Sequence, residues 1–375
     1  MPDRPVHPQY RALASRGAEA GSRQMTSWNS DLADLGWNSF YQSQLDPDAL
    51  ESALPVRVMA VHRGGLDVAG PGITARIVPY AHDPSDDEAA ATVGDWLLLD
   101  RTLRPLRRLE RKSLFKRKAA GAGRQIQLIA ANVDTLFVLS ACGQDFNPAR
   151  LERYLALARE ADVTPVIVLT KADQLDAPGD FASTAARLMP GLLVETVDAR
   201  DRNSTACLDA WCCHGQTVAL VGSSGVGKST LINTMTGAAL ATQAVRLDDQ
   251  KGRHTTTGRS LHRLPAGGWL IDTPGIRELQ LTDVKAGVDE VFEDIVALAD
   301  GCRFADCRHD SEPGCAVRAA IEAGTLDPSR LRRHRKLTTE ESRNSASLAE
   351  RLARDKAFGK MVKGIMRDKR RRQDL

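Results

Sequence analysis

The chain carries a complete phosphate-binding pattern, G-x-x-x-x-G-K-[ST], at Gly222-Ser-Ser-Gly-Val-Gly-Lys-Ser229. The pattern follows an apolar run, Thr217–Val221, and precedes a helical run from Thr230. In this context backbone N–H groups surround a β-phosphate, Lys228 reaches the β and γ oxygens, and Ser229 binds Mg²⁺. We therefore predict a strand, a P-loop and a helix that bind a nucleoside triphosphate. The predicted contacts are Gly222, Ser223, Ser224, Gly225, Val226, Gly227, Lys228, Ser229 and Thr230.

A second motif, Thr170-Lys-Ala-Asp173, is similar to the N-K-x-D motif with which GTPases recognise guanine, and it follows the apolar run Pro165–Leu169. A carboxylate at the end of a strand can accept hydrogen bonds from both N1–H and the 2-amino group of guanine, which adenine cannot match. We assign that role to Asp173 and expect Lys171 to lie along the base plane. Thr170 stands where the motif usually has Asn.

A third motif, Asp272-Thr-Pro-Gly275, matches D-x-x-G and follows the apolar run Trp269–Ile271. In this motif Asp272 holds Mg²⁺ and the Gly275 N–H contacts the γ-phosphate. Gly252-Arg-His-Thr-Thr-Thr257 lies between this motif and the P-loop, where a switch I threonine completes the Mg²⁺ shell. The spacing leaves all three threonines open, and we take Thr256 as the candidate.

The order of the motifs is unusual, because the guanine motif precedes the P-loop by about fifty residues. Ordinary GTPases have the P-loop first, so these motifs are circularly permuted. Apolar strands alternate with amphipathic segments from Thr135 to Ile271, including a predicted helix from Pro148 to Ala161. This alternation predicts a multidomain α/β protein whose central domain has a mainly parallel sheet with helices on both faces.

The flanking regions have different patterns. Short strand-like runs with Gly turns predict a small β-barrel before the α/β domain. After residue 287 the chain is helical and contains Cys302, Cys307, His309 and Cys315. Three thiolates and one imidazole complete a tetrahedral Zn²⁺ site, so we predict a structural zinc centre; the alternative is reduced cysteines packed in a core.

Charge is distributed unevenly, although the formal net charge is only +3. Residues 330–375 contain 16 Lys/Arg and 6 Asp/Glu, and residues 101–124 contain ten basic residues and one acid. Two basic segments favour a polyanionic partner, with nucleic acid as the first candidate and solvated surface charge as the alternative.

The sequence has no apolar stretch of the ~18 residues that a membrane helix needs. We therefore expect a cytoplasmic protein without membrane contact, and nothing in the sequence requires more than a monomer.

The motif order, the preceding barrel and the following Cys/His cluster together resemble the RsgA (YjeQ/YloQ) family of circularly permuted, small-ribosomal-subunit-dependent GTPases. The resemblance includes Val93-Gly-Asp-Trp96, Ala131-Asn-Val-Asp134 and Gly252-Arg-His-Thr-Thr256. The departures are Thr170 and Val197-Asp-Ala199, where the family has Asn and a Ser-Ala pair.

The resemblance implies an N-terminal OB-type barrel, a permuted GTPase domain and a C-terminal helical zinc-binding domain. The expected divisions are a disordered extension (1–34), an OB-fold RNA-binding domain (35–125), a GTPase domain (126–286), a zinc-binding helical domain (287–345) and a basic tail (346–375). The resemblance also implies that the protein binds GTP and GDP, and that it binds the 30S subunit and its 16S rRNA during late maturation of that subunit. The basic residues predicted to contact RNA are Arg107, Arg108, Arg111, Lys112, Lys116, Arg117 and Lys118.

Hydrolysis needs a group that orients water, and Ile276 follows Gly275 where many GTPases have glutamine. The resemblance implies that His254 in switch I serves instead, so that hydrolysis is slow until a partner orders switch I. Two alternatives remain open. One is an RNA-binding assembly scaffold whose nucleotide switch has negligible turnover, which Ile276 would allow. The other is a P-loop ATPase or kinase, against which Lys171 and Asp173 argue.

Overall fold

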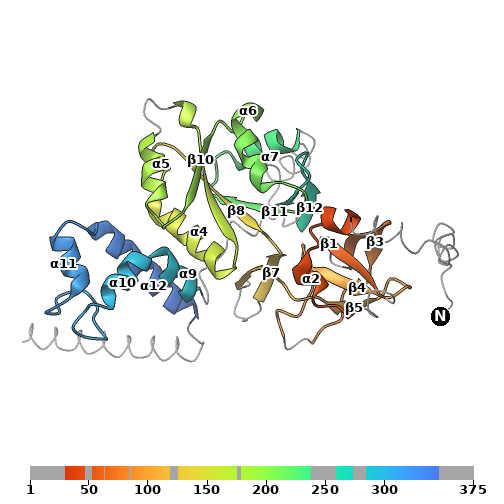
Figure 1. The fold of residues 1–375 in the computed structure, drawn as a ribbon, viewed down its shortest axis with the longest axis horizontal. Coiled ribbons are helices and arrows are strands. Elements are labelled where there is room, and N and C mark those ends of the chain that lie inside the picture. Colours follow the sequence, from red (N-terminus) through yellow and green to blue (C-terminus); the bar gives the residue numbers. More distant parts are fainter. Residues whose placement is uncertain are drawn as a thin grey trace, which may run out of the picture.

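The computed structural model describes residues 30–46, 53–62, 64–83, 86–118, 126–174, 179–237, 259–272 and 284–345. A strand-rich N-terminal region comes first in the chain, then an α/β domain, and last a group of helices. The α/β domain lies between the other two regions (Figure 1). It therefore contacts both of the regions for which the sequence predicted RNA or metal binding.

The α/β domain has strands in the spatial order β10-β9-β8-β11-β13-β12. Neighbours from β10 to β13 are parallel, and β12 is antiparallel to β13. The strands are β8 (Thr135–Ala141), β9 (Thr164–Thr170), β10 (Leu193–Val197), β11 (Thr217–Gly222), β12 (Arg259–Arg263) and β13 (Trp269–Asp272). The mainly parallel sheet predicted from the apolar runs is thus confirmed.

Helices cover both faces of this sheet, because successive strand residues point to opposite sides. Leu136 of β8 packs in one apolar cluster with Leu155 of helix α4, whereas the next residue, Phe137, packs in another with Leu231 of helix α7. The elements on the two faces are α4 (Pro148–Glu160), α5 (Gly179–Ala186), α6 (Arg202–Thr205), η3 (Ala206–Trp211) and α7 (Lys228–Thr236). The predicted helix from Pro148 is confirmed as α4.

The N-terminal region forms an antiparallel sheet in the order β3-β2-β1-β4-β5. Its strands are β1 (Leu54–His62), β2 (Gly65–Gly70), β3 (Ile73–Ile77), β4 (Trp96–Leu99) and β5 (Pro105–Arg108). Within the described ranges no strand pair closes this sheet, so the predicted OB barrel stays a prediction. Strands β6 (Leu114–Lys118) and β7 (Ile126–Ala131) pair separately, across the expected domain boundary at residue 125.

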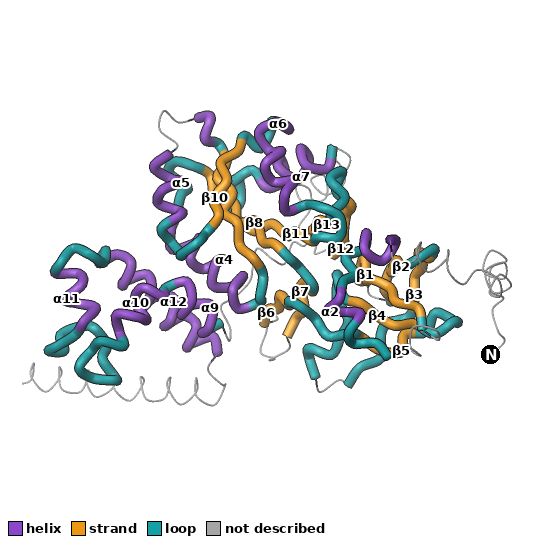
Figure 2. Tube along the Cα trace, in the orientation of Figure 1, coloured by secondary structure: helices purple, strands orange, loops and turns teal. Residues whose placement is uncertain are grey.

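The two sheets are continuous. Strand β1 pairs antiparallel with β12 through Ala60↔Ser260 and Val61↔Arg259, and Figure 2 shows the strands of both regions meeting there. Arg57 on β1 is almost fully buried and donates to the Leu35 carbonyl at 2.6 Å and to the Thr217 hydroxyl at 2.7 Å. The N-terminal sheet is therefore fixed to the strand that leads into the P-loop.

One prediction for the N-terminus is wrong. Residues 30–34, expected to be part of a disordered extension, form a helix in which Leu32 is buried. The helix is held against β13, because the Trp269 indole N–H donates to the Asp34 carbonyl at 2.7 Å. The rest of the predicted extension lies outside the described residues, as does the basic tail.

The C-terminal helices are α9 (Lys285–Val291), α10 (Glu293–Ala299), α11 (Ala316–Glu322) and α12 (Pro328–Ser345). They join the α/β domain through α9, which packs against α4, and through ion pairs from α12 to α4. Gly287 allows α9 to approach α4 very closely, since a Cβ there would lie 2.1 Å from the Ala156 carbonyl oxygen.

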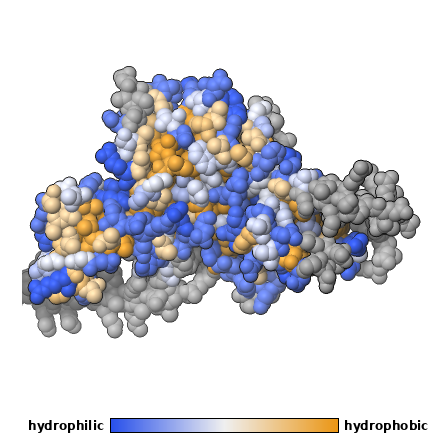
Figure 3. Space-filling model, viewed as in Figure 1, coloured by the Kyte–Doolittle hydropathy of each residue, from blue (hydrophilic) through white to orange (hydrophobic). Residues whose placement is uncertain are grey.

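The face of the molecule in Figure 3 is largely hydrophilic, with small apolar areas. Of the helices that the structure describes, none has the length and apolar character to span a membrane.

Candidate nucleotide site and metal centre

The P-loop connects β11 to α7 at the carboxyl edge of the sheet. Gly222 has a φ of +149°, and a Cβ at this position would lie 2.6 Å from the Leu139 carbonyl oxygen of neighbouring β8. Gly227 caps α7 at a φ of +94°. Glycine is needed at both positions because other residues are strained at these angles and, at Gly222, would clash.

Lys228 opens helix α7, and its side chain is folded back onto the loop. Its Nζ donates to the Gly222 carbonyl at 2.6 Å and also contacts the Ser223 carbonyl. Ser229 and Thr230 follow on the exposed first turn. A helix N-terminus preceded by a glycine-rich loop binds anions through its free N–H groups, so this arrangement can hold phosphates with Ser229 available to a metal.

A second cation lies at the P-loop. Asn147 caps helix α4, and Pro148 occupies its first turn, which places Arg150 beside the P-loop. Arg150 Nη1 donates to the Ser223 hydroxyl. Arg150 was not among the residues predicted from the sequence, although the Asn-Pro start of α4, the first helix after β8, was a signal that Arg150 would lie at the carboxyl edge of the sheet.

The guanine-motif loop is tied to the P-loop. Thr170, the last residue of β9, is fully buried and donates from Oγ1 to the Val226 carbonyl at 2.7 Å. Lys171 follows with a φ of +58°, and Asp173 is exposed in a short 3₁₀ turn. Two motifs far apart in sequence therefore lie together at this edge, and the Thr170 side chain forms the hydrogen bond between them.

The structure describes only some of the other predicted nucleotide contacts. The backbone of Asp272 ends β13, next to β11, at the same edge of the sheet as the P-loop. His254, Thr256 and Gly275 lie outside the described residues. Their roles therefore remain predictions from the motifs and, for His254, from the resemblance.

The predicted zinc ligands come together between α10 and α11. The ligand atoms of Cys302, Cys307, His309 and Cys315 all lie within 4.8 Å of one another. Cys302 Sγ is 3.9 Å from Cys315 Sγ and 3.6 Å from His309 Nδ1. Tetrahedral zinc with Zn–S bonds near 2.3 Å places its sulfur ligands about 3.8 Å apart, so this donor set fits the ion.

The basic residues near the end of the N-terminal sheet differ in how accessible their side chains are to RNA phosphates. Arg111 was predicted to contact RNA, but its side chain is 7% exposed and pairs with fully buried Asp95 at 2.7 Å. Arg111 therefore stabilises the fold and is not free for phosphate. Lys112, Lys116 and the other described side chains of the set remain partly or fully exposed; the Lys118 side chain lies outside the described residues.

Comparisons with known proteins agree with this geometry. The family model described as RsgA GTPase matches residues 108–282. The Vibrio parahaemolyticus protein named small ribosomal subunit biogenesis GTPase RsgA 2 is 50% identical over 350 residues, 93% of this chain and 96% of that protein. The Mesorhizobium japonicum small ribosomal subunit biogenesis GTPase RsgA is 49% identical over 326 residues, 86% of this chain and 93% of its own.

Two solved structures share the fold. The crystal structure of YjeQ from Thermotoga maritima superposes with a TM-score of 0.55 at 24% identity, covering 77% of this chain and 98% of that one. YloQ, titled a circularly permuted GTPase, gives a TM-score of 0.54 at 21% identity and covers 79% and 97%. The chain therefore has the circularly permuted fold of these two proteins.

Proposed function

This chain belongs to the RsgA GTPase family, and we propose on that basis that it hydrolyses GTP in the biogenesis of the small ribosomal subunit. The observation that best supports a GTPase site in the chain itself is the 2.7 Å bond from Thr170 to Val226. It joins the guanine motif to the P-loop, as a site that binds base and phosphates of one nucleotide requires. The strand order alone would not require that contact.

In the proposed mechanism, each motif performs one task. Asp173 accepts hydrogen bonds from guanine, and the P-loop N–H groups with Lys228 hold the β and γ phosphates. Arg150 adds a positive charge beside the P-loop. Mg²⁺ neutralises the phosphate oxygens when bound, and Ser229, Asp272 and Thr256 are the residues that would hold it. The Gly275 N–H stabilises the γ-phosphate as charge develops there.

Water positioning is assigned to His254, because Ile276 has no group that can orient a water molecule. A histidine in switch I acts only when switch I is placed over the phosphate. We therefore propose slow intrinsic hydrolysis that accelerates when the ribosomal partner orders switch I. Release of the protein then follows conversion of GTP to GDP.

The other regions supply partner binding in this proposal. The N-terminal region (35–125), as an OB-type domain, contacts 16S rRNA with its exposed basic residues. The GTPase domain (126–286) lies between it and a zinc-stabilised helical domain (287–345), whose basic tail (346–375) adds phosphate contacts. We place the protein in the cytoplasm and expect it to work as a monomer.

The test is GTP hydrolysis by the purified chain with and without small ribosomal subunits, with ATP as the competing substrate. We expect turnover that is GTP-selective, stimulated by the subunit and lost in Lys228→Ala. Subunit binding without turnover would favour the assembly scaffold, whereas preference for ATP would favour a P-loop ATPase.

A further inference from the structure

The loops that follow β9 and β10 leave the sheet side by side. Val197, the last residue of β10, is the parallel partner of Thr170, the last residue of β9. Residues 171–173 and 198–200 therefore start from the same edge. The second loop is held in place, because the Ala199 carbonyl accepts from Thr234 Oγ1 of α7 at 2.7 Å.

Arg200 joins these two loops. Its Nη2 is 2.7 Å from Asp173 Oδ2 and 2.9 Å from Asp198 Oδ2, so one nitrogen bridges two carboxylates. Asp198 also holds Arg200 through its other oxygen, which accepts from Arg200 Nε at 3.0 Å and from the Arg200 backbone N–H at 2.9 Å. The guanidinium is thus fixed by Asp198 and directed at Asp173.

Asp198 is itself anchored to the turn at α6. Its backbone N–H donates to the Ser204 hydroxyl at 2.8 Å. The hydrogen bonds and charge of Arg200 hold the pKa of Asp198 below its usual range. Asp198 is therefore ionised at neutral pH, and without a cation between them two negative charges would face each other at this position.

Bridging does not block the carboxylate. An ionised carboxylate offers about four lone-pair sites on its two oxygens, and Arg200 uses one of them on Asp173. Guanine needs two acceptors, one for N1–H and one for the 2-amino group. Asp173 can therefore bind Arg200 and guanine together.

We propose that Arg200 is a positioning residue that orients Asp173 for guanine and neutralises the repulsion between Asp173 and Asp198. The inference rests on the proposed function, since it assumes that Asp173 contacts the base. The bridge also explains how Asp198 can lie beside the carboxylate of Asp173, which is assigned to guanine recognition.

The test measures GDP and IDP affinity of the full chain by titration calorimetry, because IDP lacks the 2-amino group. In Arg200→Ala we expect GDP affinity to fall about 5-fold, the upper range for exposed ion pairs. IDP affinity should fall less, since hypoxanthine offers Asp173 one N–H instead of two. Arg200→Lys keeps the charge without the bridging fork and should be intermediate.

Two further variants separate positioning from general loss of structure. The double variant Asp198→Ala/Arg200→Ala should recover most of the GDP affinity, because it also removes the Asp198 carboxylate that would repel Asp173. Arg202→Ala is the matched control: Arg202 is two residues away and pairs with Asp209, so its loss should leave GDP affinity unchanged. For Arg200→Ala, kcat at saturating GTP should stay at the wild-type value while KM rises.

Wild-type GDP affinity in Arg200→Ala would overturn the inference, and so would a double variant as weak as the single one. Asp173→Asn distinguishes this failure from failure of the guanine assignment. If Asp173→Asn loses GDP affinity and Arg200→Ala does not, only the role of Arg200 is wrong. If Asp173→Asn also keeps GDP affinity, the proposed base contact fails and Arg200 has no role in recognition.

Discussion

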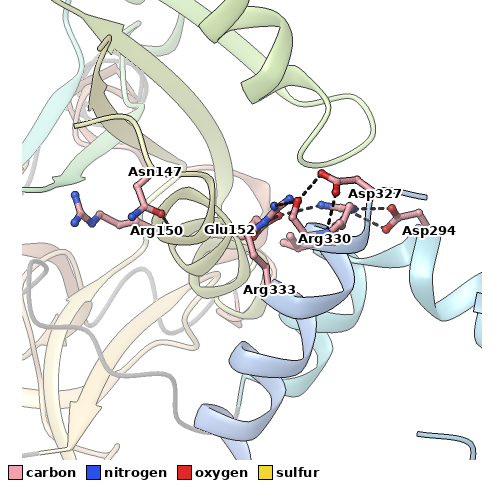
Figure 4. A network of polar contacts seen from close by, with 9 residues as sticks. Asn147, Arg150, Glu152, Asp294, Asp327, Arg330 and Arg333 are labelled. Atoms are coloured by element: carbon pink, nitrogen blue, oxygen red, sulfur yellow. Dashed lines mark hydrogen bonds and ion pairs between the residues drawn. The ribbon is translucent and has the colours of Figure 1, made fainter. Parts of the chain in front are cut away.

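Glu152 Oε1 lies 3.1 Å from Arg330 Nη1, although the two residues are 178 positions apart. Glu152 is a fully buried carboxylate on α4, and Arg330 is in the first turns of α12. Arg333, one turn later, donates from Nε to both Glu152 oxygens at 2.9 and 2.8 Å. One carboxylate thus fastens the C-terminal helices to the GTPase domain (Figure 4).

Replacing Glu152 with Gln should destabilise this junction. The change removes the negative charge that Arg333, only 21% exposed, pairs with, whereas Arg330 keeps Asp294 at 2.6 Å. Breaking one side of a buried ion pair typically costs about 3 kcal/mol, because the remaining charge is uncompensated. Urea denaturation followed by circular dichroism should show this loss in the free energy of unfolding.

Arg153→Gln is the control on the same helix. Arg153 pairs with Glu340 of α12 at 2.6 Å, but both side chains are about 30% exposed. Surface pairs contribute roughly 0.2–1 kcal/mol, so this variant should lose much less stability. Equal losses in the two variants would show that burial of Glu152 has no special importance at the junction.

Thr170→Val should weaken nucleotide binding without unfolding the protein. Valine keeps the shape of threonine but cannot donate to the Val226 carbonyl, so the guanine motif loses its bond to the P-loop. A single hydrogen bond contributes about 1 kcal/mol, which corresponds to a roughly 5-fold loss of GDP affinity. Fluorescence titration with a labelled GDP measures it.

Thr164→Val tests the same substitution at the other end of β9, where the side chain is exposed and distant from the P-loop. GDP affinity there should match wild type. Unchanged affinity in Thr170→Val would contradict a contribution of this hydrogen bond to the site.

The sequence predicted the features that depend on local pattern. Strands β8, β9 and β11 are apolar throughout or nearly so because both faces of the sheet are covered, and the start of α4 is marked by Asn147 and Pro148. The P-loop and the Cys/His cluster were identifiable because phosphate and metal binding require fixed residue types at fixed spacing. The fold shared with YloQ, titled a circularly permuted GTPase, agrees with the permuted order of the motifs.

Features that depend on distant partners could not be predicted in the same way. Strand β12 has the sequence Arg-Ser-Leu-His-Arg, which has little strand character, and it is a strand because β13 and β1 pair with it on either side. Arg111 belongs to a basic run, and only the fold shows that Asp95 holds it inside. The bridge from Arg200 to Asp173 likewise depends on the register of β9 and β10.

Acidification should weaken the C-terminal helices through His334. Its ring packs 5.1 Å from Phe292 (between ring centres), its Nδ1 is buried without a partner among the described residues, and burial holds its pKa below the usual 6.5. As pH falls, His334 is therefore protonated in the unfolded chain before it is protonated in the folded chain. Stability is full above pH 6.5 and falls as pH drops from there towards the lower folded pKa.

Denaturation at pH 7.5 and 5.5 should show this fall, and His334→Leu should reduce it by removing the group that titrates. The comparison with wild type is needed because other charges face the ring, namely Asp289, Asp294, His309 and Arg330. An identical pH dependence in the two proteins would assign the effect to those groups instead.

Removal of the metal should destabilise the C-terminal region. We expect one zinc per chain by mass spectrometry, and a lower thermal midpoint after treatment with a strong chelator, because structural zinc contributes directly to folding. Cys307→Ser is the best variant, since Cys315 also caps α11 by accepting from the Arg318 N–H at 3.4 Å and its loss would have two effects. Cys213→Ser changes an exposed cysteine outside the cluster and should keep both zinc and stability. A Cys307→Ser protein that retains stoichiometric zinc and the wild-type midpoint would exclude this cluster as the structural metal centre.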